Sequence, residues 1–409
     1  MLRAPLRSLR QFCAALLVLA VLFCLAEIGL RLYDAHTRQI SQRDHYDCQV
    51  FCKSWFMHHE LKPMQRLENT DPDRGRAVVL RTNSLGLRGP EVIVPKPPGI
   101  YRIVCLGDEQ TLAGGVDERE TFSARLQQYL QTRSTVRIEV INAGTPDYCP
   151  LLSCLQFRHK LLGLQPDLVV LNWDMSDVGD DFRFRRLVTM SEDQRPLSCS
   201  HPALEIPSNP RIEKVQEALL IPEWTRQHLG RLWVKNVLPG SDADIDSPLA
   251  RYRWLEDNPP DWTIYVRQAI EPTAELQQLA AGIYADFVVA TAPKPWQVSP
   301  RASAGAGVRE TAGVGPSAVC RSRRPFELIS DQLAERRIPF CDISPAFHAD
   351  AQGERLFFQN EAALSPAGHD LYARALAGFV LRNCRGPWTT SSPAAGQEPI
   401  TQRDRESRR

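Results

Sequence analysis

The chain has 409 residues, of which 43% are hydrophobic and 24% are charged. This composition is enough to build a large buried core, and it excludes wholesale disorder. The formal net charge of +1 leaves no basic footprint for nucleic acid, so we expect no nucleic-acid partner.

An apolar segment preceded by arginines stands near the amino terminus. Three arginines come before an apolar run from Phe12 to Ala26, which continues to Leu30 after Glu27. This length is close to the roughly 20 residues that cross a bilayer, and the arginines favour a cytoplasmic tip. A cleaved signal peptide is the alternative, but bulky residues fill the window where small ones would precede a cleavage site. We therefore predict that residues 1–32 form a single-pass anchor in the inner membrane, with the rest of the chain extracytoplasmic.

Cysteine is frequent in this sequence, with eleven residues in all. In an oxidising compartment, two pairs are close enough in the chain to form local disulfides, namely Cys48 with Cys52 and Cys149 with Cys154. Buried free thiols are the alternative, above all within strand-like runs. Neither the cysteines nor the histidines have the spacing of a zinc site, and we expect no cofactor.

The body of the chain alternates between strand-like and helix-like segments. Residues 33–99 are polar and mixed, and we predict an extracytoplasmic linker with loops leading into the domain. The strands expected from apolar runs are Tyr101–Leu106, Val136–Ile141, Asp167–Asn172, Phe287–Thr291 and Phe340–Ile343. The helices expected from apolar spacing are Thr121–Gln131, Leu151–Leu164, Thr273–Gly282, Pro325–Arg336 and Pro366–Leu381.

This alternation predicts an α/β domain over residues 100–384, built on a doubly wound parallel sheet. Residues 178–270 interrupt the pattern and are predicted to form a cap or insertion, and residues 385–409 a disordered tail. In such sheets the ligand binds outside the carboxyl ends of the strands. The ends of the first three strands are Gly107–Glu109, Asn142–Gly144 and Trp173–Asp177, and we expect them to meet.

Several sequence blocks in this order resemble the SGNH (GDSL) hydrolase family. They read NSLGLRG from Asn83, YRIVCLGDEQTLAGGV from Tyr101, INAG from Ile141, PDLVVLNWDMSDVGDD from Pro166 and LSPAGHDLYARAL from Leu364. More narrowly, the chain resembles the membrane-anchored bacterial members of this family, in which a helix ending in such a pattern precedes the domain; here the pattern is Glu27–Leu32. The resemblance implies a three-layer α/β/α sandwich and an esterase, lipase or carbohydrate acyl esterase.

The catalytic positions of that family are mostly changed in this chain. The serine nucleophile falls on Glu109, and the oxyanion-binding glycine on Gly144. The oxyanion-binding asparagine falls on Ser176, and the aspartate and histidine of the triad fall on Glu361 and Ala363. Since ester hydrolysis by this route needs a hydroxyl activated by an imidazole, these replacements disfavour the family reaction. A carboxylate at the nucleophile position would also repel a developing oxyanion.

We therefore interpret the chain as a membrane-anchored, non-catalytic SGNH-like protein that binds or scaffolds acylated glycans or other envelope material. The alternative is an active ester hydrolase or O-acyltransferase that uses non-standard residues. His369 is a candidate substitute base in that case, although it also fits a capping or packing role at the start of the last helix.

Two other features could carry function. Carboxylates at the strand ends could form a cluster that binds Ca²⁺ or Mg²⁺ or acts as an acid–base pair. The candidate side chains are Asp108, Glu109, Asp174, Asp177 and Glu361. Tryptophans in residues 178–270 could form a sugar-binding surface, but packing in the cap is the more common role. They are Trp224, Trp233, Trp254 and Trp262.

Overall fold

The computed structural model describes four main parts of the chain. They are residues 14–29 without 16 and 20, residues 50–204 without 194, residues 252–299 without 258 and 260, and residues 320–389, together with the single positions 302, 309 and 314. Statements about the structure concern these residues.

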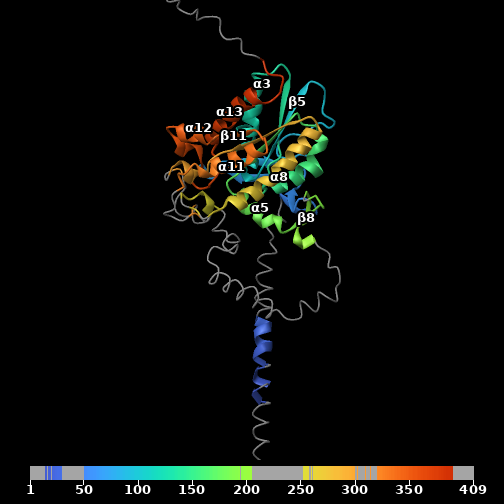
Figure 1. Ribbon diagram of the computed structural model, residues 1–409, viewed down its shortest axis with the longest axis vertical. Coiled ribbons are helices and arrows are strands. Elements are labelled where there is room, and N and C mark those ends of the chain that lie inside the picture. Colours follow the sequence, from blue (N-terminus) through green and yellow to red (C-terminus); the bar gives the residue numbers. More distant parts are fainter. Residues whose placement is uncertain are drawn as a thin grey trace, which may run out of the picture.

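The centre of the body is a five-stranded parallel sheet, in which the chain order and the spatial order differ (Figure 1). The strands are β5 (Ile100–Leu106), β6 (Arg137–Asn142), β7 (Leu168–Trp173), β10 (Asp286–Thr291) and β11 (Phe340–Asp342). Their spatial order is β6-β5-β7-β10-β11, and each neighbouring pair is parallel. The chain therefore winds to one side of β5 with β6 and to the other with β7, which puts the topological switch point between β5 and β7.

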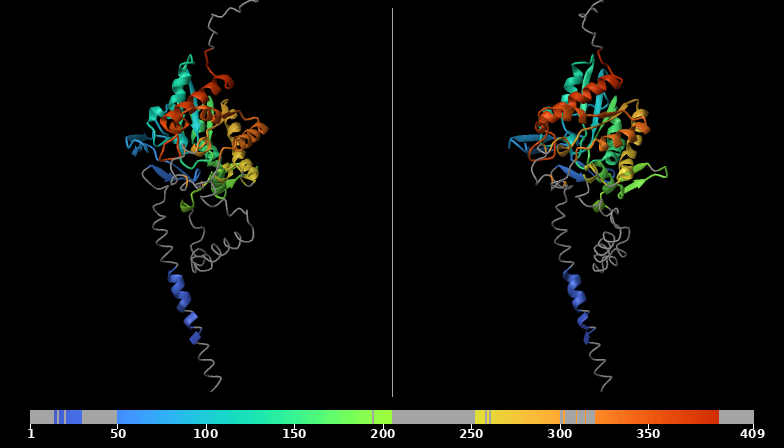
Figure 2. Two further views of the ribbon diagram at one scale, coloured as in Figure 1. Left: turned by 90° about the vertical axis from the view of Figure 1, so that its left-hand side faces the viewer. Right: turned by 60° about the vertical axis from the view of Figure 1, so that its left-hand side comes forward.

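Helices cover both faces of this sheet, so the predicted three-layer α/β/α sandwich is confirmed (Figure 2). One face carries α3 (Phe122–Gln131) and α13 (Pro366–Asn383), and the other carries α4 (Pro150–Gln156), α8 (Thr263–Gly282) and α11 (Arg324–Glu335). Because side chains alternate along a strand, Ile103 and Cys105 of β5 enter the core under α3 and α13, while Val104 and Leu106 enter the opposite core.

Before the sheet, the segment predicted as linker and loops contains regular structure from residue 50 onward. Two antiparallel pairs form there: β1 (Phe51–Lys53) with β2 (His59–Leu61), and β3 (Arg66–Thr70) with β4 (Ala77–Arg81). Residues 33–49 lie outside the described residues.

The described parts of the predicted cap pack onto the helices of one face. They include α5 (Asp177–Arg185) and the hairpin of β8 (Val188–Met190) and β9 (Pro196–Cys199), which contact α8 and α4. Trp254 and Trp262 are buried in the core beneath α8, so these two do not form a sugar-binding surface. Trp224 and Trp233 lie outside the described residues.

The terminal segments can be compared only in part with the predictions. The described residues between 14 and 29 are helical, and none of the helices within the described parts of the chain is long and apolar enough to span a bilayer. At the other end, Arg385 of the predicted tail is ordered and pairs with Asp286 at 2.6 Å. Residues 390–409 lie outside the described residues.

Cys149 and Cys154 are free thiols, so the proposed Cys149–Cys154 disulfide is wrong. Cys149 caps α4 and Cys154 lies within it, five residues later. At 100° per residue these side chains point to different sides of the helix, which prevents a bond between them. The Cys52 thiol donates a hydrogen bond to the Glu60 carbonyl oxygen, and Cys48 lies outside the described residues.

Candidate functional site

The end of β5 is shaped by a glycine that no other residue could replace without strain. Gly107 has φ +143°, and a Cβ at this position would lie 2.4 Å from Thr111 Oγ1 and 2.9 Å from the Asn172 carbonyl oxygen. Asp108 then caps the short helix α2 (Glu109–Leu112) by accepting a hydrogen bond from the Gln110 amide at 2.9 Å. The turn therefore buries Asp108 and places Glu109 at the carboxyl edge of the sheet.

Buried Arg88 holds the far end of α2. Its guanidinium donates hydrogen bonds to the carbonyl oxygens of Leu112, Ala113 and Val116. Arg88 belongs to the NSLGLRG block of the sequence, and this contact gives that block a structural role: it fixes the helix that carries Glu109.

Three of the predicted carboxylates meet at the switch point, and a lysine that the sequence analysis missed joins them. Asp108, Asp174 and Asp177 are each about 1% exposed. Lys294, in the loop after β10, is also buried, and its Nζ lies 2.7 Å from Asp174 Oδ2. We call these four residues the inner charge cluster.

Burial sets the electrostatics of the inner charge cluster. It raises the pKa of the Asp108 carboxyl well above its ordinary value, and the neighbouring charges of Asp174 and Glu109 raise it further. Burial likewise raises the pKa of Asp177, with Asp108 and Asp174 adding to the effect. For Lys294, burial is the largest single effect and opposes the charged form, but Asp174, Tyr252, Asp108 and Glu109 together outweigh it, and the pKa of Lys294 is raised.

This arrangement does not match the predicted metal cluster. Within the described parts of the chain, no group of three or more His, Cys, Asp or Glu side chains is arranged to hold a metal ion. Lys294 supplies the positive charge that the carboxylates need. Glu361 lies elsewhere, exposed beside Asp73, where partial desolvation and the charge of Asp73 raise the pKa of Glu361.

Glu109 itself is only partly buried, and it occupies a backbone donor. Its Oε2 accepts a hydrogen bond from the Asp147 amide at 3.3 Å. Asp147 has φ +60°, in the left-handed region that favours glycine. The N–H that faces position 109 therefore comes from Asp147, in the loop after β6, and a carboxylate already holds it.

Gly144, the glycine that sequence analysis assigned to oxyanion binding, has a different role. Its amide donates to Asn142 Oδ1 at 3.0 Å, within its own loop. A Cβ on Gly144 would lie 2.2 Å from the Leu112 nitrogen, so this glycine allows the loop to approach α2 closely. It is a packing residue in this structure.

The remaining family positions offer neither a free hydroxyl nor a base. The buried Ser176 hydroxyl donates to Asp174 Oδ1 at 3.0 Å, and the Ser176 amide donates to the same oxygen at 2.9 Å. Ala363 packs against the apolar group formed by Ala113, Val116 and Phe358. Its methyl group cannot accept a proton.

His369 lies in the interface between α13 and α3 and packs as a core residue. Its Nδ1 accepts a hydrogen bond from the Phe122 amide at 3.3 Å, and its ring stacks on the Phe122 ring. Burial, with a smaller effect of Arg88, lowers the pKa of His369 to about 3. The side chain is therefore neutral and committed to packing, which is the second of the two roles considered for it.

Another histidine that sequence analysis did not single out lies against the loop that carries Asp147. His59 Nε2 is 2.8 Å from the Pro146 carbonyl oxygen, and its Nδ1 is 3.0 Å from His58 Nδ1. Burial lowers the pKa of His59 to about 4. The adjacent histidines in the sequence were a visible signal, but nothing in their spacing indicated that β2 would reach the carboxyl edge of the sheet.

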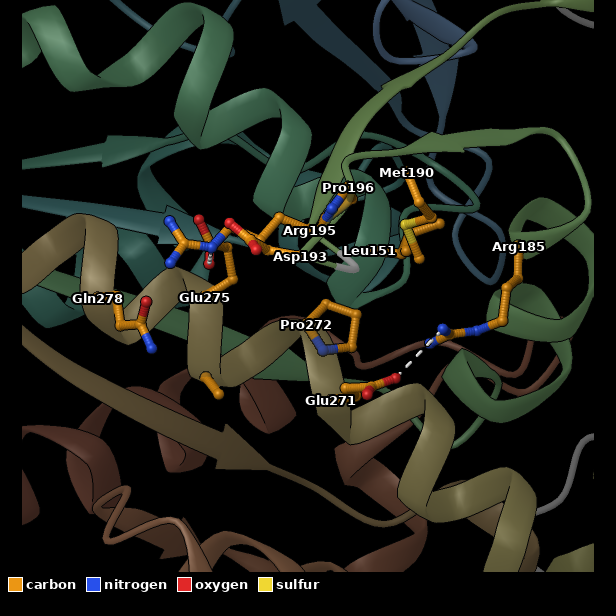
Figure 3. A pocket seen from close by; sticks show the side chains of 11 residues that line it. Leu151, Arg185, Met190, Asp193, Arg195, Pro196, Glu271, Pro272, Glu275 and Gln278 are labelled. Atoms are coloured by element: carbon orange, nitrogen blue, oxygen red, sulfur yellow. Dashed lines mark hydrogen bonds and ion pairs between the residues drawn. The ribbon is translucent and has the colours of Figure 1, made fainter.

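A separate pocket of about 540 Å³ opens between α8, α5 and the β8–β9 hairpin (Figure 3). Its lining contains none of the family positions. Charged side chains at its rim pair with one another, as Arg185 does with Glu271 at 3.3 Å and Arg195 with Glu275 at 3.7 Å. Leu151, Met190 and Pro272 give it an apolar wall.

Comparison with known proteins gives structural similarity at low sequence identity. No family model matches the chain, and no curated protein matches it. Among solved structures, the chain is similar to the acetylxylan esterase Axe2 from Geobacillus stearothermophilus, with 12% identity, a TM-score of 0.37, and coverage of 71% of this chain and 97% of that one. It is also similar to a putative lipolytic protein of the G-D-S-L family from Desulfitobacterium hafniense, with 14% identity, a TM-score of 0.32, and coverage of 68% and 99%.

A lipase/acylhydrolase from Enterococcus faecalis is similar at 13% identity, with a TM-score of 0.35 and coverage of 68% and 95%. Similarity at this level is no evidence for a shared substrate or reaction. The sheet order and the helix layers define the molecule as a doubly wound α/β sandwich. In its sequence blocks and its architecture it resembles the SGNH (GDSL) esterases.

Proposed function

We propose that this chain is a non-catalytic, SGNH-like binding or scaffold protein for acylated glycans or related envelope material. The observation that carries the proposal is the hydrogen bond from the Asp147 amide to Glu109 Oε2. In an acyl-transfer site, a nucleophile and a free N–H donor face the substrate carbonyl. Here a fixed carboxylate stands at the nucleophile position and occupies the donor.

The surroundings of Glu109 support the same conclusion. Ala363 provides no base, the Ser176 hydroxyl is bound to Asp174, and His369 is packed against Phe122. Ligand binding remains chemically reasonable at this edge, because a partly exposed carboxylate accepts hydrogen bonds from sugar hydroxyls.

We further propose that the amino-terminal segment anchors the chain in the inner membrane, with the body outside the cytoplasm. The support comes from the described residues between 14 and 29, which form a helix whose large apolar side chains are exposed. They are Leu17, Val18, Leu19, Val21, Leu22, Phe23, Leu25 and Ile28. A helix that exposes apolar groups on all sides needs an apolar surrounding.

The reaction can be tested with the purified full chain in detergent and acetyl or butyryl aryl esters. We expect no turnover above the background rate. Glu109→Ser alone should not restore it, because the base position remains Ala363. Robust turnover by the unaltered chain would overturn the proposal and favour an ester hydrolase or acyltransferase with non-standard residues.

Binding can be tested with acetylated and fully deacetylated xylo-oligosaccharides as probes. We expect the acetylated probe to raise the melting temperature of the chain, because a ligand that binds only the folded state stabilises it. Glu109→Gln, which keeps the shape of the side chain, should reduce that shift. If neither probe changes the melting temperature, the proposed ligand class is wrong even if turnover is absent.

A further inference from the structure

Four large apolar side chains are exposed together at one end of the body. Trp55 and Phe56, between β1 and β2, are 46% and 52% exposed, and Leu187 and Leu197, from the β8–β9 region, are 36% and 40% exposed. We call these four residues the tip surface. Figure 1 shows α5 and β8 at the opposite end of the body from α3.

Backbone hydrogen bonds join the parts of the tip surface. The Cys199 amide donates to the Phe56 carbonyl oxygen at 2.9 Å, and the Ser200 hydroxyl donates to the Trp55 carbonyl oxygen at 2.9 Å. His159 connects the two segments as well: its ring lies 4.8 Å from the Phe56 ring, and its Nε2 is 2.7 Å from the Leu197 carbonyl oxygen.

The turn that carries the two aromatic residues is fixed. The Ser54 hydroxyl accepts hydrogen bonds from the amides of Phe56 and Met57, both at 3.3 Å, and the Ser54 amide donates to the His58 carbonyl oxygen at 2.8 Å. The aromatic side chains are thus held outward by an ordered backbone. Exposed apolar groups that are held in place in this way mark an interaction surface.

The chemistry of the surroundings favours a lipid surface as the partner. Exposed Arg183 of α5, which pairs with Asp147 at 3.7 Å, and exposed Arg186, just after α5, are close in the chain to Leu187 of the tip surface. Tryptophan and phenylalanine next to basic residues are typical of segments that enter the headgroup region of anionic bilayers. The described part of the body begins at Val50, five residues before Trp55, and the exposed apolar helix of residues 14–29 lies upstream in the chain.

We propose that the tip surface docks in the headgroup region of an anionic lipid bilayer. Helix α5 begins at Asp177, just after the end of β7, and ends beside Leu187. Docking through the tip surface therefore turns the carboxyl edge of the sheet, with Glu109, toward the membrane. The inference is independent of the ligand that Glu109 binds.

Tryptophan quenching by brominated lipids tests this docking in the full chain reconstituted in phosphatidylcholine vesicles with and without phosphatidylglycerol. We expect brominated lipid to quench the native protein, more strongly when phosphatidylglycerol is present. Trp55→Phe should lose most of that quenching while the protein still floats with the vesicles through its amino-terminal helix. Equal quenching of the native and Trp55→Phe proteins would overturn the proposal.

Two further variants test whether the tip surface itself contacts the lipid. In Trp55→Glu/Phe56→Glu, we expect flotation to persist and the effect of phosphatidylglycerol to disappear. Tyr284→Glu is the matched control, because Tyr284 is 91% exposed at the amino edge of the sheet and should have no effect. Protection of Trp55 that depends on protein concentration rather than lipid, together with cross-linking between chains, would show that a second copy covers the surface, and would also overturn the proposal.

Discussion

Charged side chains are concentrated in two regions of the molecule, buried in one and in contact with solvent in the other. In the inner charge cluster, three carboxylates and Lys294 are removed from water, and among the described residues Asp108 Oδ2 and Asp177 Oδ1 have no hydrogen-bond partner. In the pocket beside α8, the charges are paired and in contact with solvent, as in Arg195 with Glu275. The comparison shows that charged side chains of the same types contribute very differently to folding stability in the two regions, because the cost of desolvation dominates in the inner charge cluster.

The comparison predicts its largest effect at Lys294. Lys294→Met removes the only buried cation described beside Asp108, Asp174 and Asp177, so the chain should lose about 3–5 kcal/mol of unfolding free energy at pH 7. The measurement is urea denaturation followed by circular dichroism. Lys160→Met is the matched control, since Lys160 pairs with Glu60 at 2.8 Å in a partly exposed setting and its loss should cost about 1 kcal/mol.

The direction of the pH dependence adds a second criterion to this test. A carboxyl whose pKa is raised by folding contributes stability at low pH, and that contribution is lost as the pH rises through its folded pKa. Asp108 and Asp177 are such groups, so the Lys294→Met defect should shrink as the pH is lowered from 7 toward 4. Equal losses in the two lysine variants, or a defect independent of pH, would show that the inner charge cluster is not held by Lys294.

His369 differs from both groups of charged residues, because this buried side chain remains neutral. The folded state lowers the pKa of His369 from 6.5 to about 3, so below pH 6.5 the unfolded chain takes up a proton that the folded chain does not. Stability should therefore fall with pH over this window, by about 1.4 kcal/mol per unit from this group. His369→Asn keeps an acceptor for the Phe122 amide and removes the titration, so its stability should fall less steeply between pH 6.5 and 4.

Urea denaturation at several pH values measures that slope. His159→Asn is the control, because His159 is exposed, and it should leave the slope unchanged. An unchanged slope in His369→Asn would mean that another group, such as His59, dominates acid unfolding.

The architecture could be predicted from the sequence because apolar strands and amphipathic helices are local patterns. All five expected strands of the central sheet form within one or two residues of their predicted ends. The sequence also indicated that Asp108, Asp174 and Asp177 would meet, since parallel strands that flank a switch point end at the same edge. It could not indicate Lys294, because only the fold brings the loop after β10 to that edge.

Helix α8 shows how a tertiary contact can override a local rule. A proline normally ends or kinks a helix, and the helix predicted here covered only Thr273–Gly282, after Pro272. In the structure α8 begins at Thr263 and continues through Pro272. Since proline lacks an N–H, the carbonyl oxygen of Gln268 has no helical donor, and the Arg185 guanidinium supplies one. The sequence holds no local trace of this contact, which joins α5 to α8.

The smallest expected effects concern the pocket between α8, α5 and the β8–β9 hairpin, where Arg185 and Arg195 pair with acidic residues in different environments. Arg185 donates a hydrogen bond to the Gln268 carbonyl oxygen and also pairs with Asp181. Asp181 is buried, and this burial raises its pKa to about 6. Arg185→Met leaves both groups without a donor and should cost about 1–3 kcal/mol at pH 7. Arg195 is 53% exposed and lies 3.7 Å from Glu275, so Arg195→Gln should cost about 0.5 kcal/mol or less.

Urea denaturation of the two variants at pH 7 measures the difference. Among the described arginines, only Arg185 contacts the Gln268 carbonyl oxygen, which lacks a helical donor because of Pro272. Equal losses of stability in the two variants would therefore show that this contact does not contribute, and that pairing of charges at the pocket rim determines the loss.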